Sequence, residues 1–143
     1  MKKTVLIYIE NENKYLLILK QKKDMNQNKY SGVGGKIEPG ETAYEAAVRE
    51  TKEETGLTIK PIFKGIVHFH QGAYEEHMTL FKAYEFEGKL QASDEGDLFW
   101  IDKNELKKLP MWEGDYYFIE KLENEDIFEM HLYYEGEKLI KIE

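Results

Sequence analysis

The sequence predicts an α/β or α+β fold in which helices cover a central mixed sheet. Three observations predict it. Short runs rich in β-branched and aromatic residues recur along the chain, one well-capped helix begins at Thr42, and strand-like and helix-like segments are intermixed. The chain has 143 residues, a length typical of one domain, so we expect residues 1–143 to form a single domain.

The first two elements are predicted to be strands that form a hairpin. Residues 4–9, TVLIYI, and 14–20, KYLLILK, are β-rich and are joined by the turn-like sequence ENEN. The start of the chain, MKK followed by an apolar run, superficially resembles a signal peptide. The run ends at Glu10 and no small-residue cleavage site follows, so we interpret it as a strand.

A polar loop is expected at residues 21–30, and a glycine-rich segment follows at 31–41. That segment, SGVGGKIEPGE, contains four glycines and one proline in eleven residues. Glycine is costly in regular elements because it loses the most conformational freedom when it is ordered. We therefore expect a shaped loop without regular structure.

The remaining elements follow from capping and turn signals. Thr42 and Glu45 form a capping box, which predicts a helix over residues 43–55 that stops at Gly56. A second candidate box, Asp102 to Glu105, predicts a short helix ended by Pro110. The other expected elements are strands at 57–70, 78–87 and 97–101, a helix at 114–122, and a hairpin at 127–142 that turns at Glu135-Gly136.

Composition limits the partners and the location. The net charge is −8, which disfavours direct binding to nucleic acid, and a small polyanion would need local lysines or a metal to bind. The chain has no cysteine and no long apolar run, so we expect no disulfide, no thiolate metal site and no membrane association. A cytoplasmic location is the default expectation.

Three glutamates crowd the end of the predicted central helix. Glu50, Glu53 and Glu54 are three and four residues apart, where each like-charge pair costs roughly 0.2–0.5 kcal/mol. Carboxylates without cysteine or histidine nearby favour Mg²⁺ or Mn²⁺. A bound divalent cation would turn the repulsion into attraction. A solvated acidic helix face is the plainer interpretation of the cluster alone.

The spacing of these residues resembles the Nudix hydrolase box, G-x5-E-x7-R-E-U-x-E-E-x-G-U, in which U is a bulky aliphatic residue. The one departure is Thr51 at the first U position, where we expect a small change in packing and no loss of chemistry. The residues that fit the box are Gly35, Glu41, Arg49, Glu50, Glu53, Glu54, Gly56 and Leu57.

The resemblance implies an enzyme in which water attacks phosphorus at a metal centre. Glu50, Glu53 and Glu54 would hold Mg²⁺, which Mn²⁺ can replace, with the Gly34 carbonyl as a further ligand. Either Glu53 or Glu54 would orient or deprotonate the water. Arg49 would pair with Glu41 to tie the loop to the helix, or would fix the orientation of a carboxylate ligand.

Outside the box, the chain resembles the MutT-type enzymes that hydrolyse oxidised purine nucleoside triphosphates of the 8-oxo-dGTP kind to the monophosphate and pyrophosphate. The resemblance implies that Trp112 stacks on the base and that Asp115 binds the purine edge. Glu95 would supply another metal ligand. The plainer alternatives are a core tryptophan, a first-turn helix acid and a turn acid, respectively.

Four further residues are candidates for substrate contacts. Ser31 replaces an asparagine, and Gly114 an aspartate, that the human-type enzymes have where they bind the base, which leaves the choice of base open. Lys36 would contact phosphate, although an exposed loop lysine is equally expected, and Lys20 would lie near the sugar or phosphates.

The alternatives stay open at this point. Another Nudix substrate, such as a dNTP, ADP-ribose or a dinucleoside polyphosphate, is the first, and a nucleotide-sensing module without turnover is the second. We expect a small nucleotide as the partner and a monomer or homodimer. His68 and His70 point to one side of a strand and suggest zinc, but we expect no site because no third ligand has suitable spacing.

Overall fold

The computed structural model describes residues 1–91 and 93–143. Its helices are α1 (Ala43–Thr55), the 3₁₀ helix η1 (Lys103–Lys108) and α2 (Glu113–Lys121). Its strands are β1 (Lys2–Asn11), β2 (Lys14–Lys20), β3 (Tyr30–Ser31), β4 (Val33–Lys36), β5 (Thr58–Ile59), β6 (Ile62–Gln71), β7 (Tyr74–Ala83), β8 (Phe86–Glu87), β9 (Gly96–Asp102), β10 (Phe128–Glu135) and β11 (Lys138–Ile142).

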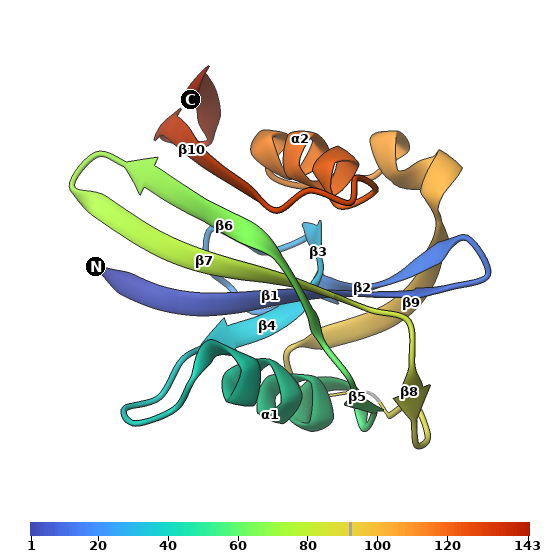
Figure 1. Ribbon diagram of the computed structural model, residues 1–143. Helices are drawn as coiled ribbons and strands as arrows, with labels where there is room; N and C mark the ends of the chain where they lie inside the picture. The colour runs from blue at the N-terminus through green and yellow to red at the C-terminus, as the bar shows by residue number, and fades with distance from the viewer. Residues whose placement is uncertain (92) are drawn as a thin grey trace.

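A mixed, curled sheet forms the centre, with α1 on one face and α2 on the other (Figure 1). The strand order is β11-β10-β6-β7-β1-β2-β3, with β4 beside β1 and β9 beside β2. The β1–β7 and β6–β10 pairs are parallel and the other pairs in this sheet are antiparallel. This arrangement confirms the predicted fold, in which helices cover a central mixed sheet.

Strand β1 lies at the middle of the sheet and is buried on both faces. Val5 and Ile7 pack in the apolar cluster beneath α1, whereas Tyr8 packs in the cluster beneath α2. One edge of β1 pairs with β7 along most of its length. The other edge is divided: its first half pairs with β4 and its last residues pair with β2.

Helix α1 begins and ends where the sequence predicts. The Thr42 hydroxyl accepts a hydrogen bond from the Glu45 backbone N–H, and the Glu45 carboxylate accepts one from the Thr42 N–H, which completes the capping box. Gly56 ends the helix with φ at +80°, a conformation that favours glycine. Ala46 and Ala47 are fully buried, so the helix backbone lies close to the sheet.

The prediction of an irregular glycine segment was wrong for Ser31, which lies in β3, and for residues 33–36, which form β4. The glycines here allow the backbone of β4 to lie close to its neighbours, and they do not form a turn. A Cβ on Gly34 would lie 2.0 Å from the Val5 carbonyl oxygen, so only glycine allows β4 to pair with β1 at this point. Strands pair through backbone hydrogen bonds, so a glycine-rich segment can form a strand without strand-favouring side chains. Composition alone therefore does not reveal β4.

Three boundaries also differ from prediction. The expected strand 57–70 is divided into β5 and β6 on either side of Pro61, which has no N–H to donate to a ladder. The expected strand 78–87 divides into β7, which already begins at Tyr74, and β8. The expected capping box at Asp102 does not form, because the Asp102 carboxylate accepts from the Asn104 N–H and a 3₁₀ helix follows.

None of the helices among the described residues is long and apolar enough to cross a membrane.

Thr51, the one departure from the Nudix box, provides a test of packing. It is fully buried, and its hydroxyl has no hydrogen-bond partner among the described residues. An unpaired buried hydroxyl costs roughly 1–3 kcal/mol, so we expect Thr51→Val to raise the free energy of unfolding by about 1 kcal/mol. Urea unfolding of the variant and the parent measures this.

Thr55→Val is the matched control. The Thr55 hydroxyl donates to the Thr51 carbonyl at 2.6 Å and accepts from the Leu57 N–H at 3.0 Å. This substitution should therefore destabilise the protein. Equal effects of the two substitutions would contradict our account of Thr51.

Candidate active site

Arg49 connects the glycine-rich segment to α1. Its Nε and Nη2 atoms donate to the two carboxylate oxygens of Glu41 at 2.7 and 2.9 Å, and Nη2 also donates to the Lys36 carbonyl at 3.0 Å. This two-point pairing lowers the pKa of Glu41 to about 2. Nη1 donates to Glu50 at 2.8 Å and to Glu53 at 3.3 Å. Arg49 therefore fixes two of the three helix acids.

Glu54 is the most buried of the helix acids. Its carboxylate accepts a hydrogen bond from the Gly34 N–H at 2.9 Å, which joins α1 directly to β4. Burial raises the pKa of Glu54 to about 7, although Lys20 and the Gly34 N–H lower it, and the nearby charges of Glu50 and Glu95 raise it further.

Glu50 lies against the glycine strand. A Cβ added to Gly35 would lie 2.5 Å from the Glu50 carboxyl carbon, so the absent side chain provides the space that this carboxylate occupies. Burial raises the pKa of Glu50 and Arg49 opposes that rise. Glu53 is exposed at the outer side of the cluster.

The donor set fits a hard divalent cation. The acids on α1 offer carboxylate oxygens alone, and neither cysteine nor histidine is hydrogen bonded to them, which suits Mg²⁺ or Mn²⁺ better than softer metals. Burial, with a smaller contribution from the neighbouring acids, raises the pKa values of Glu50 and Glu54, and a bound cation would favour their charged forms.

A cavity of about 200 Å³ adjoins the acidic cluster on the glycine side. It brings together six residues that the sequence nominates, from both the phosphate end and the base end of an expected nucleotide. These are Lys20, Ser31, Gly34, Lys36, Trp112 and Asp115.

Trp112 is a core tryptophan that also forms part of the cavity wall. It is buried and packs edge-on against Phe69 and Tyr134, with ring centroids 5.5 and 5.1 Å away. Its indole N–H donates to the Asn26 side-chain oxygen at 2.7 Å, and the residue also lines the cavity. The indole is therefore held in a fixed orientation at the cavity wall.

Asp115 is a buried acid at the same end. Burial raises its pKa to about 8 and the negative charge of Glu76 contributes further, so the carboxyl group is largely protonated at neutral pH. A neutral carboxyl group both donates and accepts hydrogen bonds, whereas a carboxylate only accepts.

The two departures from the human-type pattern have different surroundings. A Cβ on Gly114 would lie 2.5 Å from the Leu132 side chain and 2.7 Å from the Tyr134 hydroxyl, so a larger residue there would have to displace these two side chains. The Gly114 N–H donates to that same hydroxyl. Ser31 lines the cavity, and its hydroxyl donates to the Gly32 carbonyl at 2.7 Å.

Sequence reasoning missed several polar residues of the cavity, among them Asn26 and Glu76. Asn26 lies in the polar loop between β2 and β3, where nothing in the sequence distinguishes it from its neighbours. Glu76 accepts hydrogen bonds from the Thr4 and Tyr74 hydroxyls at 2.7 and 2.6 Å. Its role depends on the parallel register of β1 and β7, which periodicity does not reveal.

Comparison with known proteins agrees with this geometry. The chain matches the family described as the NUDIX domain over residues 1–122, and it therefore belongs to the Nudix hydrolases, metal-dependent enzymes that hydrolyse nucleoside triphosphates and related acid anhydrides. It is 34% identical over 113 residues to an oxidized purine nucleoside triphosphate hydrolase of Danio rerio, covering 77% of this chain and 72% of the relative.

Two further similarities bear on fold and substrate. A mutator MutT protein from Bacillus halodurans superposes with a TM-score of 0.91 at 29% identity, covering 100% of this chain and 97% of the other. A CTP pyrophosphohydrolase of Escherichia coli is 30% identical over 118 residues, covering 80% of this chain and 86% of the relative. The family and the fold predicted from the sequence are thus confirmed.

The space beside Gly35 provides a test of how the acids are positioned. Gly35→Ala should displace the flexible Glu50 carboxylate with little loss of stability, and the displacement should lower kcat by roughly 10-fold or more. Gly34→Ala is the matched control, because its Cβ would meet the Val5 backbone and should cost roughly 1–3 kcal/mol. Steady-state kinetics and urea unfolding separate the two effects. Unchanged kcat in Gly35→Ala would refute the role of this space.

The raised pKa of Asp115 makes stability depend on pH. Between about pH 4 and pH 8 the unfolded chain releases this proton and the folded chain keeps it, so stability falls as pH rises. The slope from this one group reaches at most about 1.4 kcal/mol per pH unit. We expect Asp115→Asn to remove it, which urea unfolding from pH 5 to pH 9 can measure. The exposed Asp97→Asn is the control, and parallel pH profiles for Asp115→Asn and the parent would overturn the assignment.

Proposed function

We propose that this chain hydrolyses oxidised purine nucleoside triphosphates of the 8-oxo-dGTP kind to the monophosphate and pyrophosphate, with Mg²⁺ as the metal. One observation supports this most: a single cavity is lined by Gly34 and Gly35, which contact the helix acids, and also by Trp112 and Asp115. The Danio rerio relative, named for that activity, points the same way.

At the phosphate end, Glu50, Glu53, Glu54 and Glu95 would hold Mg²⁺, together with the Gly34 carbonyl. Bound there, the cation supplies charge neutralisation for the phosphates and activation of the attacking water. Arg49 positions Glu50 and Glu53 through its hydrogen bonds to both. Lys20 and Lys36 line the cavity and would bind substrate phosphate oxygens.

Either Glu53 or Glu54 would accept the proton of the attacking water. Glu54 is held by the Gly34 N–H and faces the glycine strand, whereas Glu53 is exposed and hydrogen bonded to Arg49. A carboxylate within hydrogen-bond reach of water would orient it for in-line attack on phosphorus and accept its proton. No protein nucleophile is required, because phosphoryl transfer depends mainly on positioning and charge stabilisation.

At the base end, the fixed indole of Trp112 offers a flat surface for stacking on a purine. The protonated Asp115 carboxyl group would donate one hydrogen bond and accept another at the purine edge. Ser31 and Asn26 line the same cavity and provide further polar contacts. With its net charge of −8, the protein would bind free nucleotides and not nucleic acid.

A substrate comparison tests the proposal. With Mg²⁺ present, kcat/KM for 8-oxo-dGTP should exceed the values for dGTP, CTP, ADP-ribose and diadenosine polyphosphates. A preference for CTP would instead align the chain with the Escherichia coli relative. Equal or better rates on any of the other compounds would exclude the proposed substrate.

A matched pair of substitutions on α1 tests the catalytic role. Glu54→Gln should abolish pyrophosphate release while the far-ultraviolet circular dichroism stays unchanged. Glu45→Gln is the control, since Glu45 is an exposed acid on the same helix and glutamine also suits a capping box. If the parent binds nucleotide but releases no pyrophosphate with Mg²⁺, the chain is a sensor and not a catalyst.

A further inference from the structure

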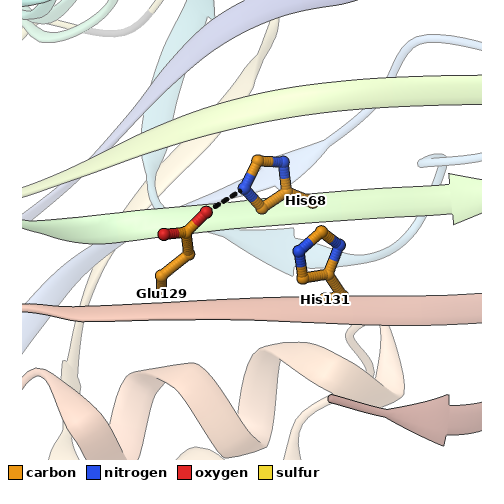
Figure 2. Close-up of side chains that lie close together, drawn as sticks. All are labelled: His68, Glu129 and His131. Atoms are coloured by element: carbon orange, nitrogen blue, oxygen red, sulfur yellow. Dashed lines mark hydrogen bonds and ion pairs between the residues drawn. The ribbon is translucent and has the colours of Figure 1, made fainter.

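We propose that His68, Glu129 and His131 form a second metal site, suited to Zn²⁺ and separate from the acidic cluster on α1. Their ligand atoms lie within 4.8 Å of one another in the structure (Figure 2). The sequence expectation that His68 has no suitable further ligands was wrong. Those ligands come from β10, about sixty residues further along the chain.

Strand register explains how the site is assembled. His131 is the direct partner of His68 in the parallel β6–β10 pair, and His77 is its partner in the antiparallel β6–β7 pair. His70 lies two residues along β6 and therefore points to the same face. All four histidines of the chain are thus gathered on one face of the sheet.

This face is not the one that borders the candidate active-site cavity. Val67 and Phe69 on β6, like Met130 and Leu132 on β10, are buried in the apolar cluster that α2 covers. Side chains alternate along a strand, so His68 and His131 project from the opposite face. The side chain of His68 is 20% exposed and that of Glu129 is 61% exposed, so an ion in solution can reach them.

The three side chains already lie close to a coordinating arrangement. The Nε2 atom of His68 is 2.6 Å from a Glu129 carboxylate oxygen. Tetrahedral zinc with ligands at 2.0–2.2 Å keeps ligand atoms about 3.3 Å apart, so the pair need separate only slightly. The His68 and His131 rings are stacked at 4.2 Å, and rotation about their soft outer torsions would turn both nitrogens toward one ion.

His70 orients His131 for this role. The Nε2 atom of His70 is 2.9 Å from Nδ1 of His131, which leaves the Nε2 atom of His131 free. One ring nitrogen of His131 faces Glu129 and the other points away from it (Figure 2). Glu75 lies 3.8 Å from Nδ1 of His70, and with the proton of His70 on that nitrogen its Nε2 would accept the Nδ1 proton of His131. Metal-binding histidines commonly have such an outer partner.

The ligand set selects the metal. Two imidazole nitrogens and one carboxylate suit Zn²⁺ and its late transition-metal neighbours, whereas Mg²⁺ prefers oxygen ligands alone. Three protein ligands leave the fourth position of a tetrahedral ion open to water or another ligand. The chain would therefore bind two different metals at two separate sites, each matched to its own donor atoms.

Zinc titration calorimetry in excess Mg²⁺ tests the proposal, because Mg²⁺ competes for the all-oxygen site. We expect one Zn²⁺ to bind to the parent protein and also to Glu54→Gln, which separates this test from the proposed function. His131→Ala and Glu129→Gln should each weaken zinc binding at least 10-fold. His70→Gln should weaken it by roughly 10- to 100-fold, since it removes only the orienting partner.

His77→Gln is the matched control. Its ring lies 5.0 Å from that of His68 on the same face, but His77 is not one of the three ligands, so zinc affinity should be unchanged. Urea unfolding checks that each variant is folded. If His131→Ala does not fold, Glu129→Gln still tests the site, because Glu129 is exposed and its substitution should not disturb the core. Unchanged affinity in Glu129→Gln, lost affinity in His77→Gln, or an anomalous zinc signal in crystals at Glu50 and Glu54 would each overturn the proposal.

Discussion

The close approach of β4 to β1 is the constraint on which the candidate active site depends. Gly34 lies where a side chain would collide with the Val5 carbonyl, and Gly35 leaves the space in which the Glu50 carboxylate lies. This pairing also brings the Gly34 N–H to Glu54 and the Lys36 carbonyl to Arg49. The backbone of one short strand thus fixes the position of α1 and of the acids upon it.

Local signals in the sequence were sufficient for some elements and insufficient for others. The capping box at Thr42 and the stop at Gly56 determine α1 through contacts within a few residues, and both were predicted correctly. The family could also be identified from the sequence, because the spacing of the acids is a pattern along the chain that needs no knowledge of long-range contacts. Strand β4 was missed because its stability comes from pairing with β1, a partner that composition does not reveal.

The histidine cluster and the cavity residues show the same limit at longer range. His68 and His131 are neighbours only because β6 and β10 pair in parallel with a particular register. Asn26 reaches Trp112 across 86 residues of sequence, and Glu76 reaches Thr4 across 72. A single sequence specifies these contacts, but spacing and periodicity along the chain do not display them.

The divided edge of β1 has a consequence for how such enzymes diversify. Its first half holds β4, which contacts the acids of α1, and its last residues hold β2, which leads into the loop that contributes Met25 and Asn26 to the cavity. Insertions or replacements in that loop would reshape the wall around a bound base while the opposite half of the strand keeps the carboxylates in register. The choice of ligand would therefore depend on the loop after β2, and the reaction on β4 and α1. New ligand preferences can arise in the loop while the carboxylates on α1 stay in place.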